Sequence, residues 1–143
     1  VVKDCYNANF DSMAAAIDFY GKLEVFGKKT FVLGDMLELG LDSKALHEKI
    51  GEIAVNQNID KIIFVGKEMA YGYFIAKEIK NTKNLLVELK SLESYDDKSI
   101  FELTEELEKS AKSGDLFFLK GSRGIKLERI ADKLAAKVVK NEI

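Results

Sequence analysis

The sequence contains no proline and no tryptophan, and only one cysteine and one histidine among its 143 residues. A single thiol, Cys5, excludes an internal disulfide, so we expect a reducing compartment, most simply the cytoplasm. Without proline, the turns must come from glycine, asparagine and aspartate. One histidine and one cysteine form no His/Cys cluster, so the sequence offers no metal site of that kind.

Long apolar runs and an excess of one charge are missing as well. The longest apolar runs have about five residues, too short to span a bilayer, and no secretory signal is visible. Lysine and arginine number 22 against 24 acidic residues, without a basic stripe, so nucleic acid is not expected as the main partner. The chain begins with Val-Val rather than Met, and we expect it to be a piece of a longer protein.

What the sequence does contain is a regular alternation of short apolar runs with helical patterns. Apolar residues make up 47% of the chain, which suits one soluble globular domain over 1–143. Strands are predicted at 29–34, 61–65, 84–89 and 115–119. These runs are continuously apolar rather than alternating, as is typical of parallel strands covered on both faces. The order predicts an α/β fold, a three-layer sandwich with a mostly parallel Rossmann-like sheet and helices on both faces.

The predicted helices lie between these strands and after the last one. A helix is expected at about 67–80, and segment 91–98 is expected to be a mobile loop. Asn9 or Asp11 should cap the first helix, and Ser43 the second. The apolar positions of the other helices recur at helical spacing: Met13, Ala16, Ile17 and Tyr20; Leu46, Ile50, Ile53 and Ala54; Ile100, Leu103, Leu107 and Ala111; Leu127, Ile130, Leu134 and Val138.

Unusual polar residues follow the predicted strands. In open parallel sheets, ligands bind outside the carboxyl ends of the strands, which makes 4–10, 34–40, 66–68 and 120–124 the informative segments. "LKGSRG" (119–124) combines a strand end, a Gly-Ser-Arg-Gly turn and a helix start. Free N–H groups at a helix start attract anions, and Arg123 can bind a carboxylate or phosphate with two hydrogen bonds. The alternative is that Ser122 only caps the helix and Arg123 points into solvent.

The second polar segment is "VLGDMLELG" (32–40). Asp35 and Glu38 are expected to face the cleft, where they could hold an ammonium group, a sugar hydroxyl or Mg²⁺ through water. The alternative is a turn or capping role for Asp35 and a solvated Glu38. His47 is either a packed or half-exposed helix residue or a site residue with a suitable pKa. Cys5 is expected to be a small buried apolar residue rather than a nucleophile.

Several familiar signatures are absent. There is no GxxxxGK[ST] phosphate loop, no GxGxxG turn and no GxSxG motif. If the chain handles a nucleotide, the triphosphate must be bound by something outside these 143 residues.

Three stretches together resemble one family. "DCYNANFDSMAAAI", "VLGDMLELGLDSKALH" and "KGSRGIKLE" resemble, in that order and spacing, the carboxyl-terminal domain of the Mur ligases, from Asp4 to about Leu134. Within that family the match is to the branch that joins D-Ala-D-Ala to UDP-N-acetylmuramoyl-tripeptide in peptidoglycan precursor synthesis. The resemblance implies that 1–143 is the third domain of a three-domain ATP-dependent ligase.

The resemblance also implies roles for individual residues. Asp4 matches the position that holds the ATP ribose, and no catalytic residue is expected in this domain. ATP and Mg²⁺ would be held mainly by the central domain, while the amino-terminal domain binds the UDP-sugar. Phe10 and Cys5 depart from the proline and the Ser or Ala that are usual there. The implied nucleotide-side residues are Asp4, Tyr6, Asn7 and Asn9; those on the dipeptide side are Asp35, Glu38, Lys120, Ser122 and Arg123, with His47 as a possible addition.

The implied reaction activates the tripeptide carboxylate as an acyl phosphate, which the dipeptide amine then attacks. The isolated domain is expected to be inactive. Three other interpretations stay open: a Mur-superfamily ligase with another amino acid substrate, a phosphorylation-regulated receiver-like module, and a stand-alone dinucleotide-binding module. The receiver-like interpretation rests on Asp35 and Lys120 at strand ends but lacks the acidic pair after the first strand, and the dinucleotide module lacks its glycine-rich turn.

Overall fold

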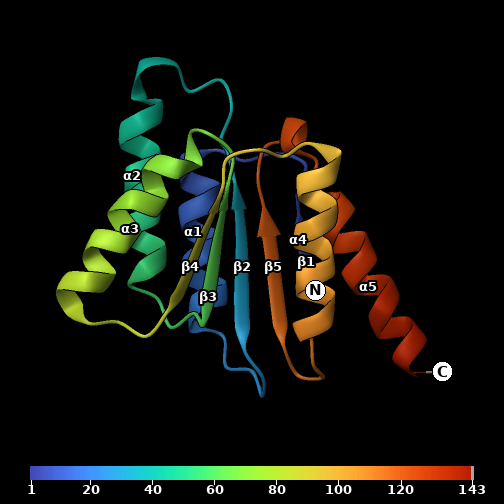
Figure 1. Ribbon diagram of the computed structural model, residues 1–143. Helices are drawn as coiled ribbons and strands as arrows, with labels where there is room; N and C mark the ends of the chain where they lie inside the picture. Colours follow the sequence, from blue (N-terminus) through green and yellow to red (C-terminus); the bar gives the residue numbers. More distant parts are fainter. Residues whose placement is uncertain (143) are drawn as a thin grey trace.

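The computed structural model describes residues 1–142, with side chains described up to Lys137. Within this range the chain forms one sheet of five parallel strands in the order β1-β5-β2-β3-β4 (Figure 1). The elements, in chain order, are β1 Val2–Asp4, α1 Phe10–Lys22, β2 Lys29–Gly34, α2 Ser43–Val55, β3 Lys61–Val65, α3 Met69–Lys83, β4 Glu88–Leu92, α4 Asp97–Ser110, β5 Leu116–Lys120 and α5 Glu128–Glu142.

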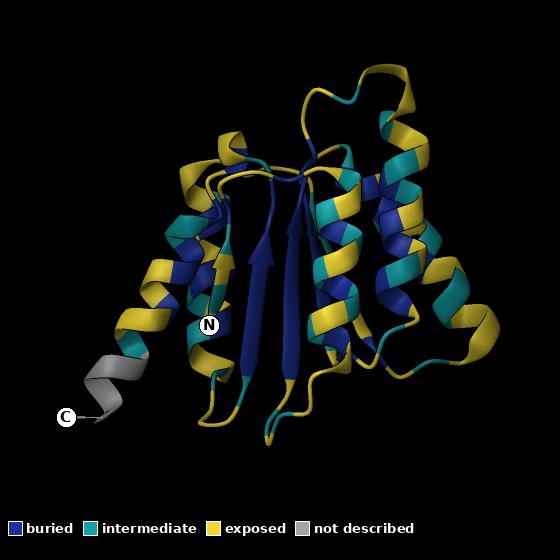
Figure 2. Cartoon of the chain, turned by 180° about the vertical axis from the view of Figure 1, so that it is seen from behind, coloured by how far each residue is buried: buried dark blue, intermediate teal, exposed yellow. Residues whose placement is uncertain are grey.

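Helices cover both faces of this sheet. Along β2, Phe31 and Leu33 point into the layer formed with α1, α2 and α3, whereas Val32 points into the layer formed with α4 and α5. This alternation is the two-residue period of a strand. β2 and β5 lie in the middle and are buried along their whole length (Figure 2). The predicted three-layer α/β sandwich with a parallel sheet is therefore confirmed.

The predicted cap is present at the start of α1 but not at the start of α2. Asn9 caps α1 as predicted: its Oδ1 accepts from the Ser12 N–H at 2.9 Å, and the Ser12 hydroxyl in turn accepts from the Asn9 N–H. The predicted cap at Ser43 is wrong. A 3₁₀ turn, Gly40–Asp42, leads directly into α2, so Ser43 is already helical, and its hydroxyl donates to Glu68 Oε2 at 2.9 Å.

The strand predicted at 84–89 exists, but the prediction places it four residues too early. Helix α3 continues to Lys83, and Asn84 then takes a left-handed conformation with φ 54°. The Leu85 N–H closes the helix on the Lys80 carbonyl at 3.0 Å. The residue after Asn84 therefore closes the end of α3 instead of starting a strand. β4 begins four residues after Asn84, at Glu88. The predicted loop 91–98 is too long at both ends, since β4 continues to Leu92 and α4 starts at Asp97.

The end of the chain differs from prediction in one respect that affects the site. No long helix begins directly after the Gly-Ser-Arg-Gly turn: a 3₁₀ turn, Arg123–Ile125, comes first, and α5 starts only at Glu128. Leu127, Ile130 and Leu134 are buried as predicted. Val138 lies outside the residues whose side chains are described. Among the described residues, no helix is both long and apolar enough to cross a bilayer.

Candidate functional site

The three loops that follow β1, β2 and β5 lie next to one another because these strands are neighbours in the sheet. All strands run the same way, so the loops gather at the edge to which the arrowheads point in Figure 1. Lys120 stands between Asp4 and Leu33 in the register of the sheet. The fold therefore brings the segments that begin at residues 4, 35 and 120 to one place.

Asp4 and Lys120 form the contact between the first and last of these segments. The Lys120 Nζ lies 2.6 Å from Asp4 Oδ2 and donates to the Asn7 carbonyl at 3.2 Å. The Lys120 side chain is only 3% exposed, whereas that of Asp4 is 45% exposed. A buried ammonium requires a partner, so Lys120 fixes Asp4 in place while part of the carboxylate stays accessible.

Arg123 and Tyr6 lie beside this pair. The guanidinium carbon of Arg123 is 5.4 Å from the centre of the Tyr6 ring, a cation–π distance, and the Tyr6 residue is 76% exposed. They line a shallow hollow of about 240 Å³ together with Lys3, Cys5 and Glu128. A guanidinium in a cation–π contact can still bind an anion through its N–H groups.

Ser122 joins the loop after β5 to the loop after β2. Its hydroxyl accepts from the Leu37 N–H at 2.8 Å, and its own N–H donates to the Asp35 carbonyl at 3.0 Å. It makes no side-chain capping bond to its own turn. The close approach requires glycine, since a Cβ on Gly121 would lie 3.0 Å from Gly34 Cα. Ser122 therefore occupies the N-cap position of the 3₁₀ turn, but its hydroxyl connects the two loops instead of capping the turn.

Asp35 is buried, with 3% of its surface exposed. Its Oδ1 accepts from the Met69 N–H, at the start of α3, at 2.7 Å. Gly66, with φ +113°, leaves room for the carboxylate where a side chain would collide with it. Burial raises the pKa of Asp35 above its usual value, although the Met69 N–H opposes that effect. Asp35 thus acts as an acceptor for a neighbouring helix start, as its capping alternative anticipated.

The remaining predicted residues are dispersed. The Asn9 side chain caps α1, and Glu38 is exposed in a left-handed conformation with φ 65°. His47 is completely buried in α2, beneath the loop after β2 rather than in a cleft. The structure therefore unites Asp4, Tyr6, Asn7, Lys120, Ser122 and Arg123, attaches Asp35 to them through the Ser122 backbone, and leaves Asn9, Glu38 and His47 at the margins.

A larger hollow of about 820 Å³ opens on the other side of the loop after β2. Its wall carries both acidic and basic side chains, and Asp35 is the only one of them that the sequence predicts as a site residue. The further polar residues of the wall are Lys67, Glu68, Glu93, Ser94, Tyr95, Asp96, Asp97, Lys126 and Arg129.

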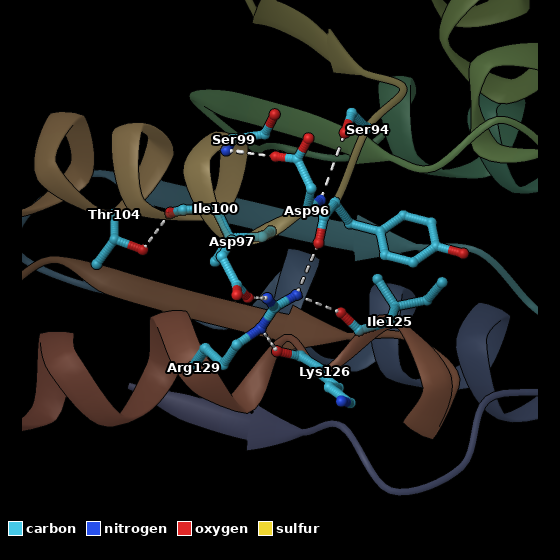
Figure 3. A network of polar contacts seen from close by, with 10 residues as sticks. Ser94, Asp96, Asp97, Ser99, Ile100, Thr104, Ile125, Lys126 and Arg129 are labelled. Carbon is cyan, nitrogen blue, oxygen red and sulfur yellow. Dashed lines mark hydrogen bonds and ion pairs between the residues drawn. The ribbon is translucent and has the colours of Figure 1, made fainter.

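Arg129 holds this wall together (Figure 3). Its guanidinium donates to Asp97 Oδ1 at 3.1 Å and to the Tyr95 and Ile125 carbonyls at 3.0 Å each, and Nε donates to the Lys126 carbonyl at 2.9 Å. The residue thereby connects the loop after β4 to the turn after β5. No local motif marks it, because three of its four partners are backbone carbonyls and two partners, Tyr95 and Asp97, come from a distant segment.

The described residues do not fit a magnesium site of their own. Among the described residues, no group of three or more His, Cys, Asp or Glu side chains is placed to hold a metal ion. Asp35 is engaged with α3 and Glu38 stands in the exposed loop, so the idea that these two hold Mg²⁺ through water gains no support.

Fold and site together define a class: a Rossmann-like α/β domain whose polar loops meet at the carboxyl edge of a parallel sheet. The chain belongs to the Mur ligase family, since the family model described as "Mur ligase, glutamate ligase domain" matches residues 1–123. This membership confirms the resemblance drawn from the three sequence stretches. It also disfavours the receiver-like interpretation, as does the pairing of Lys120 with Asp4 rather than with Asp35.

The named relatives of this chain are also Mur ligases. The chain is 38% identical over 94% of its length to the UDP-N-acetylmuramoyl-tripeptide–D-alanyl-D-alanine ligase of Bacillus subtilis, covering 27% of that protein. The ligase of the same name from Rickettsia prowazekii is 30% identical over 92% of the chain, which covers 26% of it. Among solved structures, MurF ligase from Thermotoga maritima in complex with ADP matches with a TM-score of 0.69 and 25% identity, over 96% of this chain and 28% of that one. The chain thus spans about a quarter of the length of these relatives.

Proposed function

We propose that this chain is the carboxyl-terminal domain of an ATP-dependent ligase that joins D-Ala-D-Ala to UDP-N-acetylmuramoyl-tripeptide, and that it works in the cytoplasm. The names of the relatives support this activity. The observation that carries the proposal is geometric: the three stretches that resemble the family meet at one edge of the sheet, through the Asp4–Lys120, Tyr6–Arg123 and Leu37–Ser122 contacts.

On the nucleotide side, Asp4 is proposed to accept hydrogen bonds from the two ribose hydroxyls. Its partly exposed carboxylate and its anchoring by Lys120 suit that task. Tyr6 and Asn7 would present further polar groups to the nucleotide, and Asn9 would do so only through the part of its amide that does not cap α1. The phosphates and Mg²⁺ would be held by the central domain, because this chain contains neither a phosphate loop nor a metal cluster among its described residues.

On the acceptor side, Arg123 is proposed to bind the carboxylate of the incoming dipeptide, with Ser122 beside it. Arg123 makes a cation–π contact with Tyr6, and its guanidinium N–H groups can form two parallel hydrogen bonds with a carboxylate. Lys120 would act indirectly, by holding Asp4 and the Asn7 carbonyl. Glu38 would lie on the amine side of the dipeptide, and Asp35 would support that side through its hydrogen bond to the Met69 N–H.

The chemical contribution of such a domain is positioning. In the proposed reaction ATP transfers its terminal phosphoryl group to the tripeptide carboxylate and leaves as ADP. The dipeptide amine then attacks the carbonyl carbon of this acyl phosphate, loses a proton, and displaces phosphate to form the amide. Holding amine and acyl phosphate together supplies roughly 7–11 kcal/mol in favourable systems. Closure of this domain on the other two would also exclude the water that hydrolyses an acyl phosphate.

Substrate profiling of the full-length protein tests this function. ADP formation is measured with UDP-N-acetylmuramoyl-tripeptide and either D-Ala-D-Ala or single amino acids. We expect turnover to depend on the dipeptide. Turnover with a single amino acid instead, and none with D-Ala-D-Ala, would identify another ligase of the superfamily.

A further inference from the structure

His47 is completely buried, and both of its ring nitrogens are engaged. Nδ1 lies 2.7 Å from the Ser43 carbonyl, which can only accept, so Nδ1 carries the proton. Nε2 is then the bare nitrogen, and it accepts from the Met36 N–H at 3.0 Å. The two partners thus select one neutral tautomer.

The bond to Met36 controls a loop rather than a regular element. Met36 is the second residue after β2, so no strand offers its N–H an acceptor, and an unpaired buried N–H is costly. The next residue, Leu37, donates to Ser122 Oγ, and the preceding residue, Asp35, accepts from the Ser122 N–H. Three consecutive residues are therefore held between His47 on one side and the loop after β5 on the other.

We propose that His47 is a positioning residue for the acceptor side of the site: it holds segment 35–37 so that Ser122 and Arg123 are correctly placed. This inference rests on the proposed function. The hydrogen bonds of His47 go to Met36 and Ser43, whereas Asp4 and Lys120 are fixed by their own ion pair. Loosening His47 should therefore weaken use of the dipeptide and leave use of ATP almost unchanged.

Two carboxamide substitutions in the full-length ligase separate this role from mere packing. In His47→Gln the longer side chain carries an acceptor to the place of Nε2, so it can still serve the Met36 N–H. In His47→Asn the amide reaches only the place of Nδ1, and the Met36 N–H loses its acceptor. We expect the dipeptide KM to rise about tenfold for Asn, the cost of one unpaired buried N–H, and to stay within about threefold for Gln.

The outcome that overturns the proposal is equal dipeptide KM values for the two variants, or an ATP KM that rises in parallel with the dipeptide KM. A readout independent of the reaction distinguishes failure of this proposal from failure of the proposed function. Hydrogen exchange of the full-length protein, followed by mass spectrometry, should accelerate in the peptide over 34–39 for Asn and not for Gln. Faster exchange without any dipeptide dependence would reject the function and keep His47 as the residue that fixes the loop. Unchanged exchange in Asn would reject the role of His47.

A third measurement needs no stable variant besides His47→Gln. Long-range ¹H–¹⁵N spectra of histidine-labelled full-length protein report which ring nitrogen carries the proton, and the His47 signals are those missing from His47→Gln. We expect a protonated Nδ1 and a bare Nε2. An imidazolium, or the opposite tautomer, at neutral pH would contradict the proposal, because neither can accept from Met36.

Discussion

The Lys120 ammonium lies 2.6 Å from the Asp4 carboxylate, although 116 positions separate the two residues. The contact exists because β1 pairs with β5 in parallel and places Asp4 directly beside Lys120. One partner is almost completely buried, and the other is about half exposed. The pair therefore fixes the opening segment of the chain against the middle of the sheet.

Asp4→Asn should lower the free energy of unfolding by about 1–3 kcal/mol, because it deprives a buried ammonium of its countercharge. Lys120→Met should cost less, since it leaves only a half-exposed carboxylate without a partner. Denaturant unfolding of the protein measures both. Asp132→Asn is the matched control, because it breaks the exposed Lys3–Asp132 pair, and it should cost much less than Asp4→Asn because solvent screens exposed pairs. Equal losses for Asp4→Asn and Asp132→Asn would show that burial of Lys120 is not decisive.

Asp35→Asn should increase stability at neutral pH. Asparagine still offers an oxygen to the Met69 N–H, and it removes a carboxylate whose pKa burial raises. A raised pKa favours the protonated form in the folded state, so the contribution of Asp35 is present below its ordinary value of 3.8 and is lost as the pH rises through the folded value. The advantage of Asn over wild type should therefore grow from pH 3 upwards and then level off.

Asp96→Asn provides the opposite case for the same stability measurement. The Ser99 N–H lowers the pKa of Asp96, so its contribution is present at neutral pH and is lost on acidification. Unlike Asp35→Asn, this substitution should reduce stability at pH 7. If the two variants shift stability in the same direction at pH 7, burial of Asp35 does not govern its ionisation.

Cys5 should be inert toward thiol reagents in the folded protein. Burial raises its pKa to about 11, and its Sγ contacts the Leu119 carbonyl at 3.6 Å. At pH 7 the thiolate fraction is then on the order of 10⁻⁴, roughly a few hundredfold below that of a free cysteine. Alkylation by iodoacetamide, followed by mass spectrometry, should be correspondingly slow and should accelerate in denaturant. Rapid labelling of the folded protein would contradict this placement of Cys5.

Local sequence patterns predicted the inner strands β2 and β3 correctly and misplaced the edge strand β4. The runs at β2 and β3 are apolar enough to be recognised without context, and the Asn9 cap depends only on Ser12, three residues away. β4 is an edge strand with no fully buried residue, whereas the more apolar residues just before it close α3. Its position is set by pairing with β3, which no short window of sequence contains.

In the candidate site, too, local patterns were predictable and contacts between distant segments were not. The motif segments around Asp35 and Arg123 could be read from the sequence because each follows a recognisable strand. That Ser122 would bond to Leu37 rather than cap its own turn depends on two loops approaching each other at Gly34 and Gly121. The role of Arg129 depends likewise on two segments, 95–97 and 125–129, that meet only in the folded chain.

The 143-residue chain alone should show no ligase turnover, because it contains no phosphate loop and, among the described residues, no metal cluster. Phosphate release is measured with all substrates and Mg²⁺ present, and the full-length protein serves as the positive control. Release above background by the isolated chain would refute a purely positioning role.

The most direct test of the account is the kinetics of Arg123→Ala in the full-length protein, with Arg123→Lys as the control that keeps the charge. Loss of a charge-assisted, two-point contact should raise the KM for D-Ala-D-Ala about 10-fold to 100-fold and leave the KM for ATP within about twofold, with Lys in between. Equal increases in both KM values, or no increase in either, would contradict the claim that the loops at the carboxyl edge of this sheet form the acceptor half of a shared site.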